Sequence, residues 1–120
     1  MSEYRIKFYK NPDTGKRPAY DYLMSVGSKD RAKIEKHLEY LKASEGYLDE
    51  PYSRHISGKI RELRVDFSFN RHRIFYFTFI NKNIILLHAF LKRTEKTPIG
   101  EINKALENHY NVINNPESYE

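Results

Sequence analysis

The sequence lacks several features on which common classes of protein depend. None of its 120 residues is a cysteine, which excludes disulfide bonds and any chemistry that needs a thiolate. No segment approaches the roughly 20 consecutive apolar residues that a membrane-spanning helix needs, and no apolar signal region stands at the N-terminus. We therefore expect a cytoplasmic protein that makes no contact with a membrane.

The motifs of several enzyme classes are also missing. None of the five histidines has a second histidine or a carboxylate at a close metal-ligand spacing, so no metal site is expected. The chain contains no Gly-x-Ser-x-Gly motif, no glycine-rich phosphate loop and no dinucleotide-binding fingerprint. A serine hydrolase and an enzyme of nucleoside triphosphates are therefore not indicated.

The most informative feature that the chain does have is concentrated positive charge. The whole chain carries a net charge of +5. Between Arg54 and Pro98 lie ten lysines and arginines against three acids, a net charge of +7, and these cations alternate with apolar and aromatic residues. That alternation is typical of strands, which hold their side chains in fixed positions. Fixed cations suit a polyanion or a phosphate group undergoing reaction.

Periodic hydrophobicity predicts the secondary structure. The predicted strands cover residues 4–9, 59–67, 71–79 and 83–92. The predicted helices cover residues 18–26 and 28–44, and Thr97-Pro98 opens a final helix. Residues 46–54 are expected to form a loop and residues 114–120 a frayed tail.

This order of elements predicts one α+β domain over residues 1–120, with a small, mainly antiparallel sheet, two N-terminal helices and a C-terminal helix. The strand at 83–92 is almost wholly apolar, so we expect it to be central in the sheet. The final helix is expected to have Pro98 at its first position. The stripe that this helix is expected to bury comprises Ile99, Ile102, Leu106, His109, Tyr110 and Ile113.

Strand geometry predicts that some of the cations form one patch. Antiparallel neighbours would bring Arg64, Arg73 and one of Lys92 or Arg93 together. The planar fork of an arginine holds two phosphate oxygens, and a lysine packed among other cations has a lowered pKa and becomes a plausible base. A patch of this kind suits the cleavage of RNA through its 2′-hydroxyl, because the phosphate gains negative charge in that reaction.

Each candidate also has an ordinary structural interpretation. Arg64 can pair with Glu62 and stabilise the sheet, and Arg73 can form a structural salt bridge. His88 lies in the middle of an apolar strand and is expected to be a core histidine. The patch is therefore not expected to contain a strong pair of a histidine and a carboxylate.

Three short units give the pattern its specificity. They are Glu62-Leu63-Arg64, Arg73-Ile74-Phe75-Tyr76 and Phe90-Leu91-Lys92-Arg93-Thr94 with Thr97-Pro98. In this order and spacing they resemble the HigB branch of the RelE/ParE-like type II toxins, phage-derived HigB-like toxins included, over about residues 4–112. The resemblance implies a RelE-like microbial RNase fold. It also implies a ribosome-dependent endoribonuclease that cleaves mRNA by attack of the 2′-hydroxyl on the scissile phosphate, with no metal or organic cofactor.

The resemblance also implies partners. A toxin of this kind is neutralised by a cognate antitoxin, here expected to be a HigA-like helix-turn-helix protein. It acts on the ribosome and mRNA, and it meets operator DNA only through the antitoxin.

Family roles can be carried over to single residues. The resemblance implies that Arg73 contacts the scissile phosphate and that Lys92 and Arg93 act on the transition state or the leaving group. It implies a part-structural, part-catalytic role for Arg64, and it places His55 in a loop where some members have a catalytic histidine. The cations expected to hold the surrounding RNA are Lys59, Arg61, Arg71 and Lys96.

Two alternatives remain open at this point. One is a toxin of the same fold that binds a protein target such as gyrase, because a fold does not determine the chemistry of its site. The other is a non-enzymatic module that binds RNA or DNA through its basic sheet.

Overall fold

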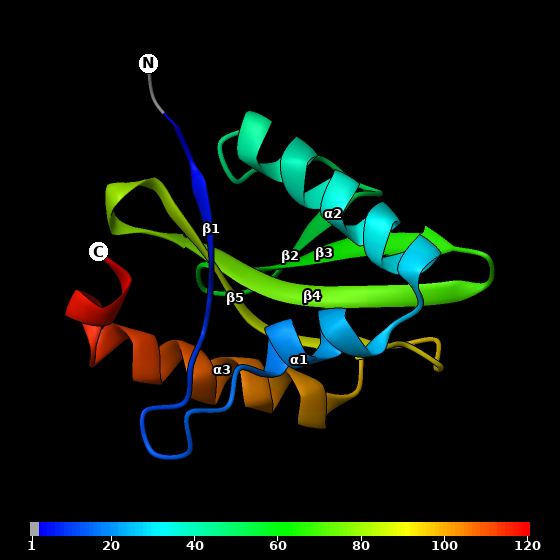
Figure 1. Ribbon diagram of the computed structural model, residues 1–120. Coiled ribbons are helices and arrows are strands. Elements are labelled where there is room, and N and C mark those ends of the chain that lie inside the picture. The colour runs from blue at the N-terminus through cyan, green and yellow to red at the C-terminus, as the bar shows by residue number, and fades with distance from the viewer. Residues whose placement is uncertain (1–2) are drawn as a thin grey trace.

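The computed structural model describes residues 3–120 and has a five-stranded sheet at its centre (Figure 1). The strands are β1 (Arg5–Phe8), β2 (Ser53–Ser57), β3 (Ile60–Phe67), β4 (Asn70–Phe79) and β5 (Asn83–Leu91). The helices are α1 (Pro18–Ser25), α2 (Ser28–Ala43) and α3 (Ile99–Ile113), with short 3-10 turns η1 (Ile80–Lys82) and η2 (Pro116–Tyr119). The strand order is β1-β5-β4-β3-β2, and only the β1–β5 pair is parallel. The predicted α+β class with a mainly antiparallel sheet is confirmed.

The sheet is covered on both faces, so alternate residues of its strands enter two different cores. On one face Leu63, Val65 and Ile74 pack with residues of α1 and α2. On the other face Phe75 and Phe77 pack with residues of α3. β5 lies between β1 and β4, and helices cover the sheet on both faces. Its residues are therefore all buried except Leu91, which is half-buried. The prediction of an internal apolar strand is confirmed.

Two of the predicted boundaries are wrong in ways that matter for the site. The segment 46–54 is not wholly a loop, because β2 begins at Ser53 and contains His55. The last helix begins at Ile99, with Pro98 as the residue before it rather than as its first position. No side chain caps α3, since the hydroxyl of Thr97 donates instead to the Glu62 carboxylate.

The buried face of α3 also differs from the prediction. Ile99, Leu106, Tyr110 and Ile113 are exposed, although all four belong to the predicted stripe. The helix instead buries Ala105 and Val112 completely, with Ile102 packed beside them. A small residue at the point of closest approach lets the helix lie close to the sheet, and hydrophobicity alone does not reveal this. The exposed residues form an apolar stripe on the outer side of α3.

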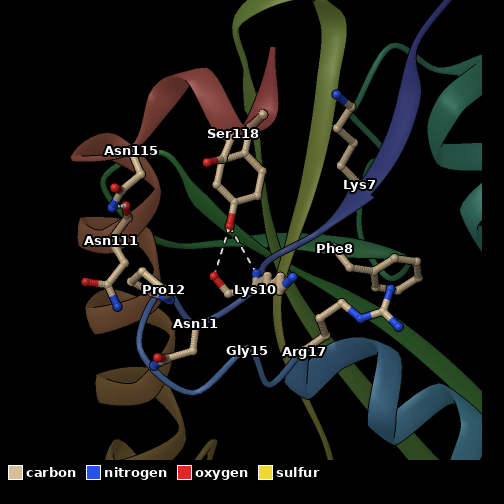
Figure 2. Close-up of a pocket in the computed structure, with 11 residues that line it drawn as sticks. Lys7, Phe8, Lys10, Asn11, Pro12, Gly15, Arg17, Asn111, Asn115 and Ser118 are labelled. Atoms are coloured by element: carbon tan, nitrogen blue, oxygen red, sulfur yellow. Dashed lines mark hydrogen bonds between the residues drawn. The ribbon is translucent and has the colours of Figure 1, made fainter.

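The C-terminal segment is not frayed. The Tyr119 side chain is 5% exposed, and its hydroxyl accepts a hydrogen bond of 3.0 Å from the Lys10 backbone N–H (Figure 2). The Asn83 amide of β5 donates to the Tyr119 carbonyl. Figure 2 shows that this segment closes one side of a hollow that Lys7, Lys10 and Arg17 also line.

No helix in the described part of the chain is both long and apolar enough to span a bilayer.

Two tyrosines test the packing of this C-terminal segment. Tyr119→Ala should lower the free energy of unfolding by about 3 kcal/mol, because it removes a buried ring and a hydroxyl with a backbone partner. Tyr110→Ala is the matched control, since Tyr110 is 68% exposed on α3, and it should change stability by less than about 0.5 kcal/mol. Denaturant unfolding followed by circular dichroism measures both. Equal stabilities of the two variants would contradict the docked position of Tyr119.

Candidate active site

Three neighbouring strands place the cations of the candidate site. In the sheet register Arg64 of β3 lies directly opposite Arg73 of β4. Alternation puts Glu62 beside Arg64, and Arg71 beside Arg73, on the face that α3 covers. Lys92 follows the end of β5, and its backbone N–H donates to the Arg71 carbonyl at 2.8 Å. The ladder therefore extends just far enough to fix Lys92 next to the arginines. We call Glu62, Arg64, Arg71, Arg73 and Lys92 the cationic cluster.

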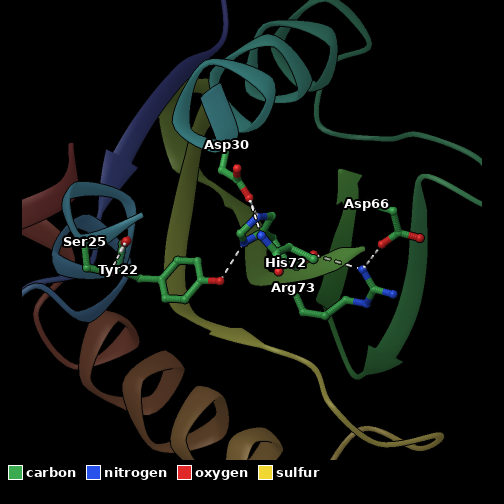
Figure 3. Close-up of polar contacts among 7 residues, drawn as sticks. Tyr22, Ser25, Asp30, Asp66, His72 and Arg73 are labelled. Atoms are coloured by element: carbon green, nitrogen blue, oxygen red, sulfur yellow. Dashed lines mark hydrogen bonds and ion pairs between the residues drawn. The ribbon is translucent and has the colours of Figure 1, made fainter. Parts of the chain in front are cut away.

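Three members of the cationic cluster are almost closed to solvent, while Arg64 and Arg71 are half-buried. Arg73 and Glu62 are each 1% exposed and Lys92 is 7% exposed. The Arg73 Nη1 donates to Asp66 Oδ1 at 2.7 Å and to the His72 carbonyl at 3.0 Å (Figure 3). The ordinary interpretation of Arg73 as half of a salt bridge therefore holds for one nitrogen of its guanidinium group.

Two other guanidinium nitrogens have no partner. The Nε atoms of Arg64 and Arg73 are buried and make no hydrogen bond within residues 3–120. Arg64 Nε lies 3.9 Å from Glu62 Oε1, which is an ion pair but too long for a hydrogen bond. Buried donors without partners are rare and costly, so these two N–H groups remain available to a further hydrogen-bond acceptor.

The environment of Lys92 makes its charged form less favourable than that of an exposed lysine. Burial lowers the pKa of Lys92 below its ordinary value, and the nearby charges of Arg73, Arg64 and Arg71 lower it further. The Glu62 carboxylate acts in the opposite direction. A lysine with a lowered pKa is a better proton acceptor near neutral pH than an exposed lysine.

Glu62 belongs to the site, although the sequence suggested it only as a partner for Arg64. Its carboxylate is buried, and Oε2 accepts a hydrogen bond of 3.1 Å from the Thr97 hydroxyl. This bond fixes the segment between β5 and α3 against the cationic cluster. Strand alternation predicted that Glu62 lies on the same face as Arg64. The residues around Glu62 gave no indication that Thr97, 35 positions later, would donate a hydrogen bond to it.

A histidine–carboxylate pair lies on the same face of the sheet but is not part of the cationic cluster. His88 Nε2 and Glu101 Oε1 are 2.7 Å apart, and the histidine ring stacks with the rings of Phe75 and Phe90. His88 is buried as a core histidine should be, but its partner is the first-turn glutamate of α3. Glu101 was visible in the sequence, but it was interpreted only as an acidic residue of the first helical turn and not as a partner for His88.

Two predicted catalytic residues do not join the cationic cluster. Arg93 is exposed and lies on the side of the sheet where Tyr22 of α1 lies, close enough for its charge to act on the Tyr22 hydroxyl. His55 lies on β2 opposite Arg61, is exposed, and makes a hydrogen bond of 2.8 Å to the Gly58 carbonyl. Alternation from Ser53 places His55 on the sheet face that α2 covers, away from Arg73.

The four cations predicted to hold RNA lie in different places. Arg71 is part of the cationic cluster, while Lys59 and Lys96 are exposed. Arg61 is engaged elsewhere, since its guanidinium group donates to Ser53 Oγ at 3.0 Å and to the Leu48 carbonyl at 3.2 Å. Arg61 therefore holds the segment before β2 in place.

A second polar network fixes β4 from the opposite face. His72 hydrogen bonds to the Tyr22 hydroxyl at 2.6 Å and to Asp30 Oδ2 at 2.7 Å, and Asn70 donates to the same oxygen (Figure 3). Burial raises the pKa of Tyr22 to about 12, with a further contribution from the Asp30 charge. Hydrogen bonds from Asn70 and His72 lower the pKa of Asp30. The residue next to Arg73 is thereby tied to both N-terminal helices.

No group of three or more potential metal ligands comes together within residues 3–120.

Comparison with protein families shows to which family the chain is related. The model of a family described as phage derived protein Gp49-like (DUF891) matches residues 21–109. The chain belongs to the Gp49-like family. The match runs from α1 into α3 and includes every residue of the cationic cluster. The Gp49-like family is a toxin-like family of the RelE/HigB type. No curated protein matches the chain.

The network around Asp30 predicts how stability depends on acid. Because the pKa of Asp30 is lowered in the folded state, its contribution is complete above its ordinary value of 3.8 and is lost as the pH falls through the lower folded value. Asp30→Asn should therefore show a flatter loss of unfolding free energy below about pH 4 than the unaltered protein. Urea unfolding at a series of pH values measures this difference.

The control for this prediction is Asp21→Asn, which changes an exposed aspartate in the first turn of α1. Its pH profile should follow that of the unaltered protein. If Asp30→Asn also follows that profile, the hydrogen bonds drawn to Asp30 do not lower its pKa.

Proposed function

We propose that this protein is the toxin of a type II toxin–antitoxin system, of the HigB branch and with a RelE-like microbial RNase fold. We propose further that it is a metal-independent endoribonuclease that cleaves mRNA on the ribosome. Membership of the Gp49-like family supports the toxin assignment. The observation that carries the nuclease assignment is the pair of buried, unpartnered Nε–H groups of Arg64 and Arg73 beside Lys92.

The charges around these groups favour a phosphate. Four cations, Arg64, Arg71, Arg73 and Lys92, face two carboxylates, Glu62 and Asp66. A buried cation without a full set of partners is costly, and a bound anion removes that cost. Arginine binds phosphate through two parallel hydrogen bonds, which matches guanidinium groups that still have free donors.

Asp66 gives the substrate a way in. It contacts the buried Arg73 at 2.7 Å, but its own side chain is 64% exposed. Rotation of this one exposed side chain would uncover Arg73 Nη1 without disturbing the core. In this interpretation the aspartate holds the arginine in position until a phosphate oxygen replaces it.

The proposed reaction divides its tasks among the residues of the cluster. The neutral amine of Lys92 accepts the proton of the 2′-hydroxyl, whose oxygen then attacks phosphorus. Arg73 and Arg64 stabilise the extra negative charge on the phosphate oxygens. The bond from phosphorus to the 5′-oxygen breaks, and the leaving oxygen takes a proton from water. One fragment then ends in a cyclic phosphate and the other in a 5′-hydroxyl.

The proposed partners follow from the same assignment. They are a HigA-like helix-turn-helix antitoxin, the ribosome and mRNA, with operator DNA contacted only through the antitoxin. The positive segment from Arg54 to Pro98 suits association with ribosomal and messenger RNA. The proposed site of action is the cytoplasm.

One observation favours a second candidate, a toxin that binds a protein target such as gyrase. The outer side of α3 exposes the apolar residues Ile99, Leu106, Tyr110 and Ile113. Exposed apolar stripes of this kind mark protein interfaces. Loss of DNA supercoiling without transcript cleavage would favour this candidate.

Mapping of transcript 5′ ends after brief induction tests the proposal. The unaltered protein should arrest growth and produce new 5′ ends at codon positions. Arg73→Ala and Lys92→Met should each reduce cleavage by roughly 100-fold or more, because the first removes a charge that stabilises the phosphate and the second removes the proposed base. Lys82→Met is the matched control, because Lys82 is an exposed lysine in η1, and it should cleave normally.

Circular dichroism and equal protein levels must accompany these variants, since Arg73 is buried. Growth arrest by folded Arg73→Ala at the level of the unaltered protein would exclude Arg73 from the site. The absence of new 5′ ends with the unaltered protein would refute the nuclease proposal.

The role of Lys92 as a base predicts a pH dependence. Because its pKa is lowered, the cleavage rate should rise with pH and level off below the ordinary lysine value of 10.5. Lys92→Arg keeps the positive charge but does not deprotonate, so it should lose about 100-fold or more in rate together with this rise. Single-turnover cleavage of an mRNA bound to ribosomes measures both. A Lys92→Arg protein of full activity would show that the charge alone matters.

A further inference from the structure

An aromatic cleft lies beside the cationic cluster. It consists of two hollows, one of about 490 Å³ and one of about 190 Å³, that share Lys33, His37 and Tyr52. The larger hollow continues along the C-terminal half of α2 to Tyr40. Figure 1 shows α2 lying across β3, so the cleft follows the junction between this helix and the sheet.

The inner end of the cleft reaches Arg64 of the cationic cluster. The smaller hollow is lined by Arg64 and Asp66 as well as by Tyr52. The Arg64 backbone N–H donates to the Tyr52 carbonyl at 2.8 Å, which fixes the tyrosine next to the arginine. Asp66 is the same side chain that holds Arg73. A chain with a phosphate at Arg64 would have its next unit within reach of this hollow.

The walls of the cleft present ring faces that the fold does not use. Tyr52 is 52% exposed and Tyr40 is 47% exposed, although both rings lie against buried His37. The His37 ring is held in place, since Nδ1 donates to the Lys33 carbonyl at 3.0 Å. Rings that served only the core would be covered, whereas these are supported from behind and open in front.

The charges along the cleft favour a polyanion as its occupant. Asp66 is the one carboxylate among the residues that line the two hollows, and Arg73 already neutralises it. Lys33 and Arg64 supply positive charge within reach of the rings. An apolar peptide would gain little from these cations, while a nucleic acid would place its phosphates beside them and its bases on the rings.

We propose that the aromatic cleft binds one or two unpaired bases of single-stranded RNA next to the phosphate held by the cationic cluster. This inference rests on the proposed function. It names the unpaired bases as the part of the RNA that determines where the RNA lies on the protein. Tyr52 stacks on the base nearest the scissile phosphate, His37 supports the ring, and Tyr40 extends the platform. Stacking on aromatic rings is the usual means by which proteins hold single-stranded RNA.

A fluorescent oligonucleotide tests the proposal on the full chain. The probe is a 2′-O-methyl hexanucleotide that contains 2-aminopurine, which cannot be cleaved through a 2′-hydroxyl and loses fluorescence when it stacks. The unaltered protein should bind it and quench it. Tyr52→Leu should weaken binding by at least about fivefold and abolish the quenching, because it removes the stacking face. Tyr52→Phe keeps the ring and should behave as the unaltered protein does.

The matched control is Tyr110→Leu, which removes an exposed tyrosine from α3, far along the chain from the cleft. It should leave binding and quenching unchanged, and thermal unfolding should show that all variants are folded. Tight binding and full quenching by Tyr52→Leu, or no binding by the unaltered protein, would overturn the proposal. The proposal would also be overturned if Tyr52→Leu bound the RNA probe normally and lost affinity only for a protein partner.

The test separates the cleft from the proposed function. If Tyr52→Leu cleaves ribosome-bound mRNA with unchanged KM and kcat, the cleft proposal fails and the nuclease stands. If the unaltered protein binds and quenches the probe in a Tyr52-dependent way but cleaves no transcript, the cleft proposal stands and the nuclease fails.

Discussion

The pairing of β3 with β4 is the constraint on which the rest of the site depends. It places two guanidinium groups, those of Arg64 and Arg73, directly opposite each other, an arrangement that is destabilising in a sheet. The sheet tolerates it because β3 alternates acid and base along one face, so that Glu62 and Asp66 flank Arg64. Even so, the Nε atoms of both arginines remain without partners. The fold therefore leaves two fixed guanidinium groups each with a free donor, and the proposed function assigns these donors to a phosphate.

The sequence predicted the features that depend on strand period. Alternation along β3 and β4 brought Arg64 and Arg73 to one face, and the apolar run of β5 placed it inside the sheet. Features that depend on where an element ends were not predictable in the same way. Lys92 and Arg93 are adjacent in the sequence, but β5 ends at Leu91, so one is buried in the cationic cluster and the other is exposed.

The remaining errors have physical reasons of two kinds. β2 was missed because Ser53–Ser57 is a largely polar strand at the sheet edge, stabilised by pairing with β3 rather than by its own hydrophobicity. The face of α3 and the position of Tyr119 were missed because they depend on distant contacts. Ala105 is buried because its small side chain lets α3 lie close to the sheet. Tyr119 is held by Lys10, just after β1, and by Asn83 of β5. A single sequence shows which residues are hydrophobic, but it does not show the shape of the surface against which a helix or side chain will pack.

The two networks on β4 connect the faces of the sheet. His72 and Arg73 are neighbours in the strand, so their side chains point to opposite faces (Figure 3). His72 is held by Tyr22 of α1 and Asp30 of α2, and its carbonyl accepts a hydrogen bond from Arg73. The position of the arginine is therefore set from both sides, by Asp66 at the surface and by the N-terminal helices behind the strand. α1 and α2 thus contribute to the cationic cluster by fixing the strand that carries its most deeply buried cation.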